Sequence, residues 1–437
     1  MAVSLPYNLP KNRLFGLIPL LVFVIIGCQS EKMSENNQSA IFPYGNVPPD
    51  KPNMPLSEAM NRVYEGSYTS KEVETNELFS NFKYTPLEGL DYHDGDGTIS
   101  RRDVSKVIFA NGKYYVWYTR RETSTPPSAK YGNDTIPSRD WDLAEIWYAT
   151  SEDGFTWEEQ GVAVSRMEKP YAGWRSVSTP DILVWKGKYY LYYQAYLYMP
   201  GGPGTQGDDC PVSVSWSDSP DGPWTPSNKI VVENGPSGTW DQYVIHDPYP
   251  LIYQGKIHLY YKGEMGGDPR VRAQGLAIAE DPLGSFEKHP LNPVINSGHE
   301  TALFPFKEGV AALVSRHGLE HNTIQYSPDG VNFQVAAISS LFPIAPGAYV
   351  PDAFEDTGNG RGITWGLCHF RNIGLAEGKS HSILARFDCD LSLDVHDPEM
   401  KQSDIFNHPD INFQFGLSEQ QCRRIDANQP VATIQQE

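Results

Sequence analysis

Acidic residues recur at the start of similar segments along this chain. These lead acids are Asp103, Asp181, Asp247, Glu300 and Asp352. Arginines precede the first of them, and His246 and His299 directly precede the third and fourth. Carboxylates gathered around one pocket suit glycoside hydrolysis, in which one group protonates the leaving oxygen while another activates water. Each acid taken alone could equally cap a turn, and the two without charged neighbours favour that structural role.

The segments that follow the acids share one pattern. An aromatic or apolar run leads to a Gly turn, then to a second run ending in an aromatic pair, and then to a third run before a D-G or P-x-G turn. The runs alternate apolar and polar residues and are rich in Tyr, Val, Ile and Trp, which is typical of strands. Repeated four-stranded units of this kind predict a β-propeller. We therefore expect an all-β fold, a five-bladed β-propeller over residues 100–400 with a C-terminal extension at 401–437. Its inner strands would bring the lead acids to one central pocket.

Two segments ahead of these units have helical character, LSEAMNRVYEG at 56–66 and KEVETNELFSNF at 71–82. Ser57 is placed to cap the first helix. Helices this short bury little surface by themselves, so they must pack on the blades or on another chain. Residues 56–99 are therefore predicted to form an N-terminal helical segment.

The first residues resemble an export signal. Lys11 and Arg13 precede a short apolar run that ends in Gly27-Cys28, whereas a membrane-spanning helix needs about 20 apolar residues. This pattern predicts a lipoprotein-type signal peptide at 1–28 with Cys28 as the lipidated residue, although an ordinary signal peptide could also contain a cysteine. The polar, Pro-rich residues 29–55 are expected to be a tether. The protein would then be exported and periplasmic, or anchored in the outer membrane by its lipid alone.

Composition narrows the class of ligand. The chain has 54 Asp and Glu against 35 Lys and Arg, a formal net charge of -19. This balance argues against nucleic acid, which needs clustered basic residues, and favours a neutral or cationic ligand over a polyanion such as a sulfated glycan. No CxxC pair is present to predict a zinc-thiolate site. The disulfide pairing is left open by the remaining cysteines, Cys210, Cys368, Cys389 and Cys422.

Long strings of this sequence resemble glycoside hydrolase family 117. They are GDGTISRRD (95–103), WDLAEIWYATSEDGFTW (141–157), GWRSVSTPDILVWKGKYYLYYQ (173–194), IHDPYPL (245–251) and LNPVINSGHETALFPF (291–306). The resemblance covers nearly all of residues 56–400. It implies an inverting exo-glycosidase that releases 3,6-anhydro-L-galactose from the non-reducing end of neoagarobiose and neoagaro-oligosaccharides in agar degradation. Ser57, Ala59 and Arg62 match the family's SxAxxR motif, on helices exchanged between protomers, which implies a homodimer.

The resemblance also assigns roles within the site. Asp103 resembles the general base and Asp247 the acid that orients the site, while His299 resembles an unusual general acid with Glu300 beside it. We expect nearby carboxylates to raise the pKa of His299. The family has a proline after the first of these acids, where this chain has Val104. The sugar-contacting residues implied by the resemblance are Trp141, Thr179, Gln194 and His246.

Two other functions are compatible with the sequence. One is another five-bladed glycosidase, arabinofuranosidase-like, that uses Asp103, Asp247 and Glu300 without His299. The other is a non-catalytic sugar-binding lipoprotein. No cofactor is expected to be required. The resemblance leaves room for a divalent cation near the propeller axis, but no ligand cluster in the sequence identifies one, so no metal-binding residue is predicted.

Overall fold

The structure is a computed structural model that describes residues 44–65, 75–200, 210–263, 272–339, 341–356, 358–371 and 381–402. The predicted signal peptide with Cys28, tether residues 29–43 and extension residues 403–437 lie outside the described residues, as does Cys422. Among the residues described, no helix is long and apolar enough to cross a lipid bilayer.

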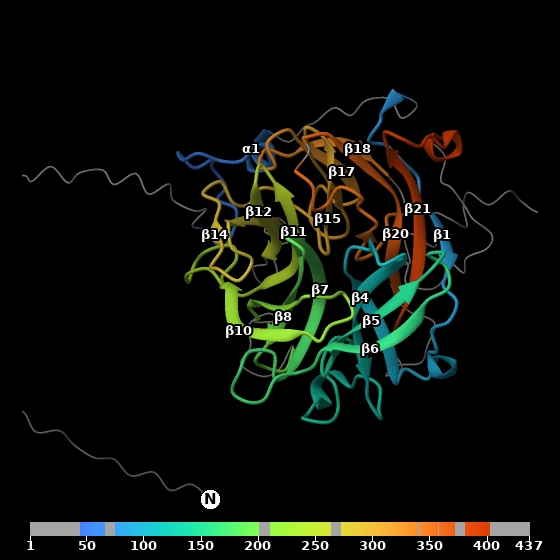
Figure 1. Cartoon of the computed structure of the whole chain (residues 1–437). Coiled ribbons are helices and arrows are strands. Elements are labelled where there is room, and N and C mark those ends of the chain that lie inside the picture. The colour runs from blue at the N-terminus through green and yellow to red at the C-terminus, as the bar shows by residue number, and fades with distance from the viewer. Residues whose placement is uncertain are drawn as a thin grey trace, which may run out of the picture. The chain divides into compact units, whose positions relative to one another are not determined.

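Antiparallel strands dominate the described part of the chain (Figure 1). They form four hydrogen-bonded sheets, accompanied by one α-helix and short 3-10 turns. The α-helix is α1 (Glu58–Glu65), and the 3-10 turns are η2 (His93–Gly95), η3 (Ala129–Tyr131) and η5 (Pro398–Lys401). The prediction of an all-β protein with a short N-terminal helical segment is confirmed.

Three of the sheets each correspond to one predicted unit. The first contains β2 (Ile99–Val104), β4 (Lys113–Glu122), β5 (Glu145–Ser151) and β6 (Glu158–Val164), with β3 (Ile108–Ala110) paired to β4. The second contains β7 (Ser176–Trp185), β8 (Lys188–Tyr196), β9 (Val212–Ser217) and β10 (Thr225–Val232). The third contains β11 (Ile245–Tyr253), β12 (Lys256–Gly263), β13 (Ala273–Ala279) and β14 (Glu287–Lys288).

The fourth sheet joins strands from two predicted units. It contains β1 (Lys83–Pro86), β21 (Ser382–Ser392), β20 (Gly360–Arg371), β15 (Ala302–Lys307), β16 (Gly309–Val314), β17 (Thr323–Ser327) and β18 (Gln334–Ile338), with β19 (Gly347–Ala348) paired to β20. The link between the units is short, because β15 pairs with β20 only through Phe306 and Lys307. The early strand β1 pairs with the late strand β21, so distant parts of the sequence complete one sheet.

The first strands of the units lie against one another. β7 contacts both β2 and β11, β11 also contacts β15, and β2 contacts β20. These strands are mostly buried; every residue of β11 and of β2 is enclosed. Fully buried strands need apolar residues on both faces. The polar residues on them, such as the ISRRD run of β2, therefore carry a desolvation cost and must find partners.

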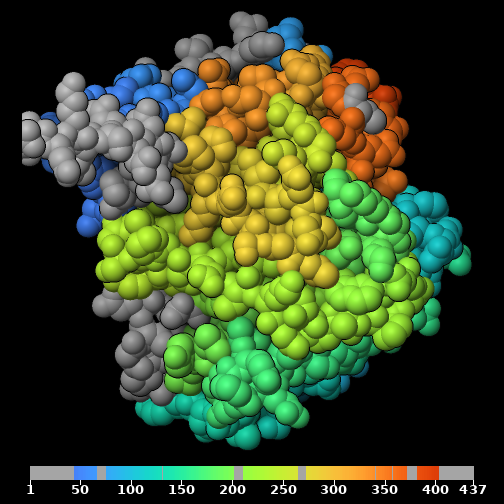
Figure 2. All heavy atoms as spheres, turned by 60° about the vertical axis from the view of Figure 1, so that its left-hand side comes forward, coloured from blue at the N-terminus to red at the C-terminus, as the bar shows by residue number. Residues whose placement is uncertain are grey.

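Helix α1 packs onto the surface formed by residues 293–333. Ser57 caps it as predicted, since its Oγ accepts from the Met60 amide at 3.2 Å while donating to the Pro293 carbonyl at 2.5 Å. The Arg62 guanidinium forms two hydrogen bonds with Glu320, at 2.9 and 3.0 Å. In the space-filling view the blue N-terminal segment lies beside the yellow and orange segments that carry these partners (Figure 2).

The prediction of a second helix at 71–82 is wrong for residues 75–82, which form a turn and irregular backbone, while residues 71–74 lie outside the described residues. The Asn76 side chain accepts a hydrogen bond from the Leu78 amide at 3.0 Å, a local turn that competes with a helix. Leu78, Phe79 and Phe82 are then buried in the core of the fourth sheet. Burial of these apolar side chains outweighs the helical tendency of the sequence around them.

Candidate active site

The inner strands carry non-glycine residues in the left-handed region of backbone space. Asp103, Thr179, Asp247 and Glu300 have φ of 49°, 48°, 53° and 59°. The pairing register of β2, β7 and β11 shifts at the first three of these positions. Each such conformation costs about 1–3 kcal/mol and persists where the surroundings impose it, commonly at functional sites. Bulges of this kind redirect a side chain that regular alternation would send to the other face of the strand.

One cavity lies among these positions. It measures about 20 Å³ and is lined by the four residues just described and by Ala345, whose φ is 49°. Ala345 therefore takes the corresponding position in the fifth unit, where no acid is present. Three predicted site acids, Asp103, Asp247 and Glu300, thus converge on one cavity from three different strands or their edges.

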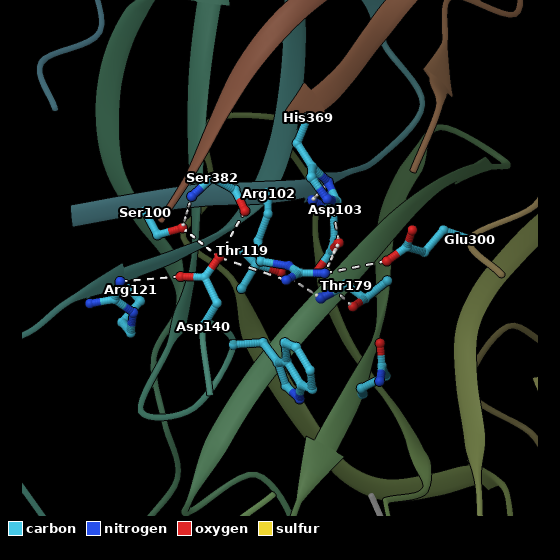
Figure 3. Close-up of polar contacts among 12 residues, drawn as sticks. Ser100, Arg102, Asp103, Thr119, Arg121, Asp140, Thr179, Glu300, His369 and Ser382 are labelled. Atoms are coloured by element: carbon cyan, nitrogen blue, oxygen red, sulfur yellow. Dashed lines mark hydrogen bonds and ion pairs between the residues drawn. The ribbon is translucent and has the colours of Figure 1, made fainter. Parts of the chain in front are cut away.

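Arg102 and Asp103 form the most closely bonded pair in the site. The bulge at Asp103 lets the two neighbouring side chains meet, so that Arg102 Nε lies 2.7 Å from Asp103 Oδ2 and Nη2 lies 3.0 Å from Oδ1 (Figure 3). The same Nη2 reaches Glu300 Oε1 at 3.3 Å. Thr179 Oγ1 adds a longer contact to Asp103 at 3.4 Å. Bidentate guanidinium bonds hold a carboxylate in one orientation, as a general base requires.

Asp247, His299 and Glu300 form the second half of the site. The Glu300 amide donates to Asp247 Oδ2 at 3.0 Å, and Lys262 Nζ lies 3.6 Å from the same oxygen. His299 Nε2 lies 3.7 Å from Glu300 Oε1 and 3.9 Å from Asp247 Oδ2. The His299 side chain is 23% exposed and that of Glu300 only 4%. A ligand in the site would therefore meet the imidazole before the Glu300 carboxylate.

Burial sets the proton affinities of this half of the site. It raises the pKa of Glu300 to about 7, helped by Asp103 and Asp247 and opposed by Arg316 and Arg102. It also raises the pKa of Asp247, against the attraction of Lys262. The pKa of His299 lies well below its usual value, first because of burial and then because of Lys262 and Arg316. The expectation that carboxylates would raise it is wrong, since desolvation and these cations outweigh them.

Several residues of the site carried no recognisable sequence signal. His317 Nδ1 lies 3.0 Å from His299 Nδ1, and Arg316 Nη1 lies 3.4 Å from Glu300 Oε2. Both come from the turn after β16, which lies far from Asp103 and Asp247 along the sequence. His369 on β20 accepts a hydrogen bond from the Asp103 amide at 3.2 Å. The SRHG string, in which Arg316 and His317 are adjacent and a glycine follows, is the one weak sequence indication of functional residues at this turn.

The four predicted sugar-contacting residues lie around this centre. The Trp141 ring lies 4.9 Å from Arg102 Cζ, and the Thr179 hydroxyl contacts the base as described. Gln194 Nε2 and His246 Nε2 both bond Tyr196 Oη, at 3.0 and 3.3 Å. The buried Oε1 of Gln194 has no hydrogen-bond partner among the described residues. An unsatisfied buried acceptor of this kind suits a ligand hydroxyl.

The other two lead acids are structural. Asp181 forms a buried ion pair with Lys106, and its Oδ1 accepts from the Lys106 and Ile182 amides at 2.7 and 2.9 Å. Asp352 bonds the half-exposed guanidinium of Arg361 at 3.1 Å. The preference for a structural role at both positions is thereby supported. In the second unit it is Thr179, two residues earlier, that occupies the position equivalent to Asp103.

A divalent cation does not fit between the carboxylates. Asp103, Glu300 and His369 offer ligand atoms that all lie within 4.8 Å of one another. The guanidinium of Arg102, however, already contacts both carboxylates, at 3.0 and 3.3 Å. A metal ion there would have to displace a buried arginine and overcome its repulsion. We therefore assign no step of the reaction to a metal.

Comparison with known proteins places this site in an enzyme family. No protein-family model and no curated protein matches the chain. Among solved structures, Zg3597, a family 117 glycoside hydrolase produced by the marine bacterium Zobellia galactanivorans, is 61% identical. The alignment covers 76% of this chain and 97% of that one, with a TM-score of 0.72.

More distant structures are also glycoside hydrolases. CoXyl43, a GH43 β-xylosidase/α-arabinofuranosidase from a compost microbial metagenome, is 18% identical over 69% of this chain and 94% of that one, with a TM-score of 0.44. Another glycoside hydrolase is 13% identical over 75% of this chain and 94% of that one, with a TM-score of 0.46. The identity and coverage of the Zobellia structure decide the assignment: this chain is a glycosidase that belongs to glycoside hydrolase family 117.

Proposed function

We propose that the chain is an inverting exo-glycosidase that releases 3,6-anhydro-L-galactose from the non-reducing end of neoagarobiose and neoagaro-oligosaccharides during agar degradation. The observation that carries this proposal is the convergence of Asp103, Asp247, His299 and Glu300 on one site. These are the residues that the family resemblance assigns to the reaction, and separate strands bring them together.

The geometry suggests how the roles divide. Asp103 and Glu300 present ligand atoms within 4.8 Å of each other, whereas carboxyl groups that flank the water of an inverting reaction stand about 6.5–9.5 Å apart. Glu300 is therefore poorly placed to face Asp103 across the bond. We assign water activation to Asp103 and proton delivery to His299. Glu300, with its pKa raised to about 7, holds a proton 3.7 Å from His299 Nε2. It passes this proton to the imidazole and becomes a carboxylate, and the imidazolium so formed delivers the proton to the leaving oxygen.

Hydrolysis of neoagarobiose tests the proposal directly. Purified protein should convert the disaccharide into equal amounts of galactose and 3,6-anhydro-L-galactose, and proton NMR should detect first the anomer of opposite configuration. The Asp103→Asn protein serves as the control for contaminating hydrolases. Release of arabinose from an aryl α-L-arabinofuranoside, with neoagarobiose untouched, would instead support the arabinofuranosidase-like alternative. Neoagarobiose binding without any product would support a sugar-binding protein.

We also infer that the strands form a five-bladed β-propeller. The joined fourth sheet then counts as two blades that touch through the β15–β20 pairing, with β19, β20, β21 and β1 as the fifth blade. Support comes from the left-handed residues of all five units, which line one cavity. In this arrangement β1 closes the ring by adding an early strand to the last blade.

Export and dimerisation remain proposals that rest on the sequence. We propose an exported lipoprotein anchored through Cys28, and a homodimer in which the segment with α1 is exchanged. Light scattering of residues 29–437 should then give the mass of two chains. The structure shows Arg62 bonded to Glu320 of the same chain, and in the exchanged dimer this contact would join two chains. Arg62→Glu should then lower the dimer fraction, because it would place a second carboxylate against Glu320. A monomeric mass for the unmutated protein would rule out the exchanged helix.

A further inference from the structure

Arg102 is the cation shared by the base and the proton store. Its guanidinium makes two bonds to Asp103 and one to Glu300, at 2.7, 3.0 and 3.3 Å. The side chain is only 9% exposed, so water contributes little to its solvation. The positive charge of a buried guanidinium must be balanced by hydrogen-bond acceptors or anions around it. The two reactive carboxylates occupy one side of it, and something must hold the other.

Asp140 lies on that other side and is itself firmly fixed. Its Oδ2 is 3.7 Å from Arg102 Nη1 and accepts from the Ser100 and Ser382 hydroxyls at 2.9 and 2.8 Å (Figure 3). Its Oδ1 accepts from Arg121 Nη2 at 3.1 Å. The donors come from β2, β4 and β21, so two sheets fix one carboxylate.

The charge of Asp140 is stable in this position. Burial alone would raise its pKa, but Arg121, Arg102 and the two serine hydroxyls outweigh burial and lower it. Asp140 is therefore an anion throughout the neutral range. An anion fixed by the scaffold attracts the guanidinium from behind and limits how far it can move toward the carboxylates.

The loop around Asp140 contains a matched acid for comparison. Trp141 follows Asp140 and covers one face of the guanidinium, with 4.9 Å between Arg102 Cζ and the ring. Asp142 comes next, is equally buried, and bonds Arg175 through two contacts of 2.6 Å. Its hydrogen bonds go to Ser138, Leu143 and Arg175, and within the described residues none joins it to Arg102 or to the reactive carboxylates. The two aspartates thus differ in one relevant respect, since only Asp140 contacts the arginine of the site.

We propose that Asp140 is a positioning residue for the hydrolysis: it holds Arg102 in register between Asp103 and Glu300, so that this arginine sets the orientation and charge of both carboxylates. The proposal rests on the glycosidase function proposed above. Asp140 touches neither substrate nor reacting atoms, and it acts entirely through Arg102.

Asp140→Asn tests the proposal because it keeps the size and most hydrogen bonds but removes the charge. In this variant the Arg102 guanidinium is no longer held in place. We expect kcat to fall about 100-fold with little change in KM, because misplacing a catalytic group by about 1 Å has an effect of this size. With one anion fewer near Arg102, the proton affinity of Glu300 should fall, and the alkaline limb of the pH profile should move to lower pH. Arg102→Met should move that limb to higher pH. Glu300 is otherwise faced by Asp103, Asp247, His299, Arg316 and His369, which both variants retain.

The matched control is Asp142→Asn, which neutralises the neighbouring buried acid. It should lower stability and can alter KM through Trp141, but the alkaline limb should stay where it is. An equal shift of that limb in Asp142→Asn would overturn the proposal, because general loosening of the loop would then explain both. If Asp140→Asn does not fold, Ser382→Ala removes one donor to Asp140 and should shift the limb in the same direction by less.

A readout independent of turnover separates this proposal from the proposed function. In a proton–nitrogen NMR spectrum, the buried Arg102 Nε–H should give a slowly exchanging signal, assigned by its loss in Arg102→Met. Asp140→Asn should broaden or lose this signal, while Asp142→Asn should keep it. If the protein hydrolyses no tested sugar yet shows this pattern, the positioning role holds and only the substrate assignment fails. An unchanged Arg102 signal in Asp140→Asn would refute the role whatever the activity.

Discussion

Replacing Asp103 with asparagine is expected to lower the rate of hydrolysis about 10²–10⁴-fold while the fold remains intact. An amide cannot take the proton from the attacking water. Both oxygens of Asp103 are bonded to Arg102 at 2.7 and 3.0 Å, so the carboxyl group is already oriented before substrate arrives. Asparagine has nearly the same shape, and the site around it is enclosed. The loss should therefore appear in kcat rather than in KM.

Azide provides a sharper form of this experiment. A small anion that attacks without a base should restore turnover in Asp103→Asn and give a glycosyl azide of inverted configuration. Asp352→Asn is the matched control, because Asp352 is also a lead acid but its carboxylate bonds Arg361, through the backbone amide and the half-exposed guanidinium, and not the site. It should keep nearly full activity. Near-normal turnover in Asp103→Asn would show that Asp103 has a structural role, as Asp181 and Asp352 do.

The strand units could be predicted from the sequence because the alternation of apolar and polar residues that marks a strand is visible within a few consecutive residues. The sequence also predicted Asp103, Asp247 and Glu300, which occupy equivalent places in their units. The fifth position could not be found in this way, because it is Ala345 rather than the acid Asp352 that lines the cavity. The equivalence depends on where the backbone takes a left-handed conformation and the pairing slips, and no single residue type marks that point.

The electrostatics of the site were harder still to predict. His299 lies next to Glu300 in the sequence of an acidic protein, which predicts a raised pKa for the imidazole. In the folded protein burial lowers the pKa of the imidazole, and Lys262 from β12 and Arg316 from the turn after β16 lower it further. Such long-range neighbours are set by the assembled sheets rather than by spacing along the chain. The same holds for Asp140, whose partners Ser100 and Ser382 lie in different sheets.

The second large effect concerns the proton donor. Glu300 loses its proton as the pH rises through about 7, so a reaction that draws on this proton should slow on the alkaline side of that value. A general acid and a general base that act together give a bell-shaped pH profile, and Glu300 sets its alkaline limb. Glu300→Gln removes the carboxyl group that holds this proton, so the alkaline limb near pH 7 should disappear. The rate of neoagarobiose hydrolysis should also fall by about 10²–10⁴-fold.

His299→Ala should remove the delivering group and slow reactions with poor leaving groups most. An activated aryl glycoside of 3,6-anhydro-L-galactose needs little protonation, so its hydrolysis by this variant should be nearly normal while neoagarobiose hydrolysis is strongly impaired. The partial exposure of His299, 23% against 4% for Glu300, is the reason to expect delivery from the imidazole. Equal loss on both substrates would assign the delivery to Glu300 instead, with His299 acting only in binding. The ratio of the two rates in the two variants therefore separates these roles, because only the group that hands over the proton makes the rate depend on the leaving group.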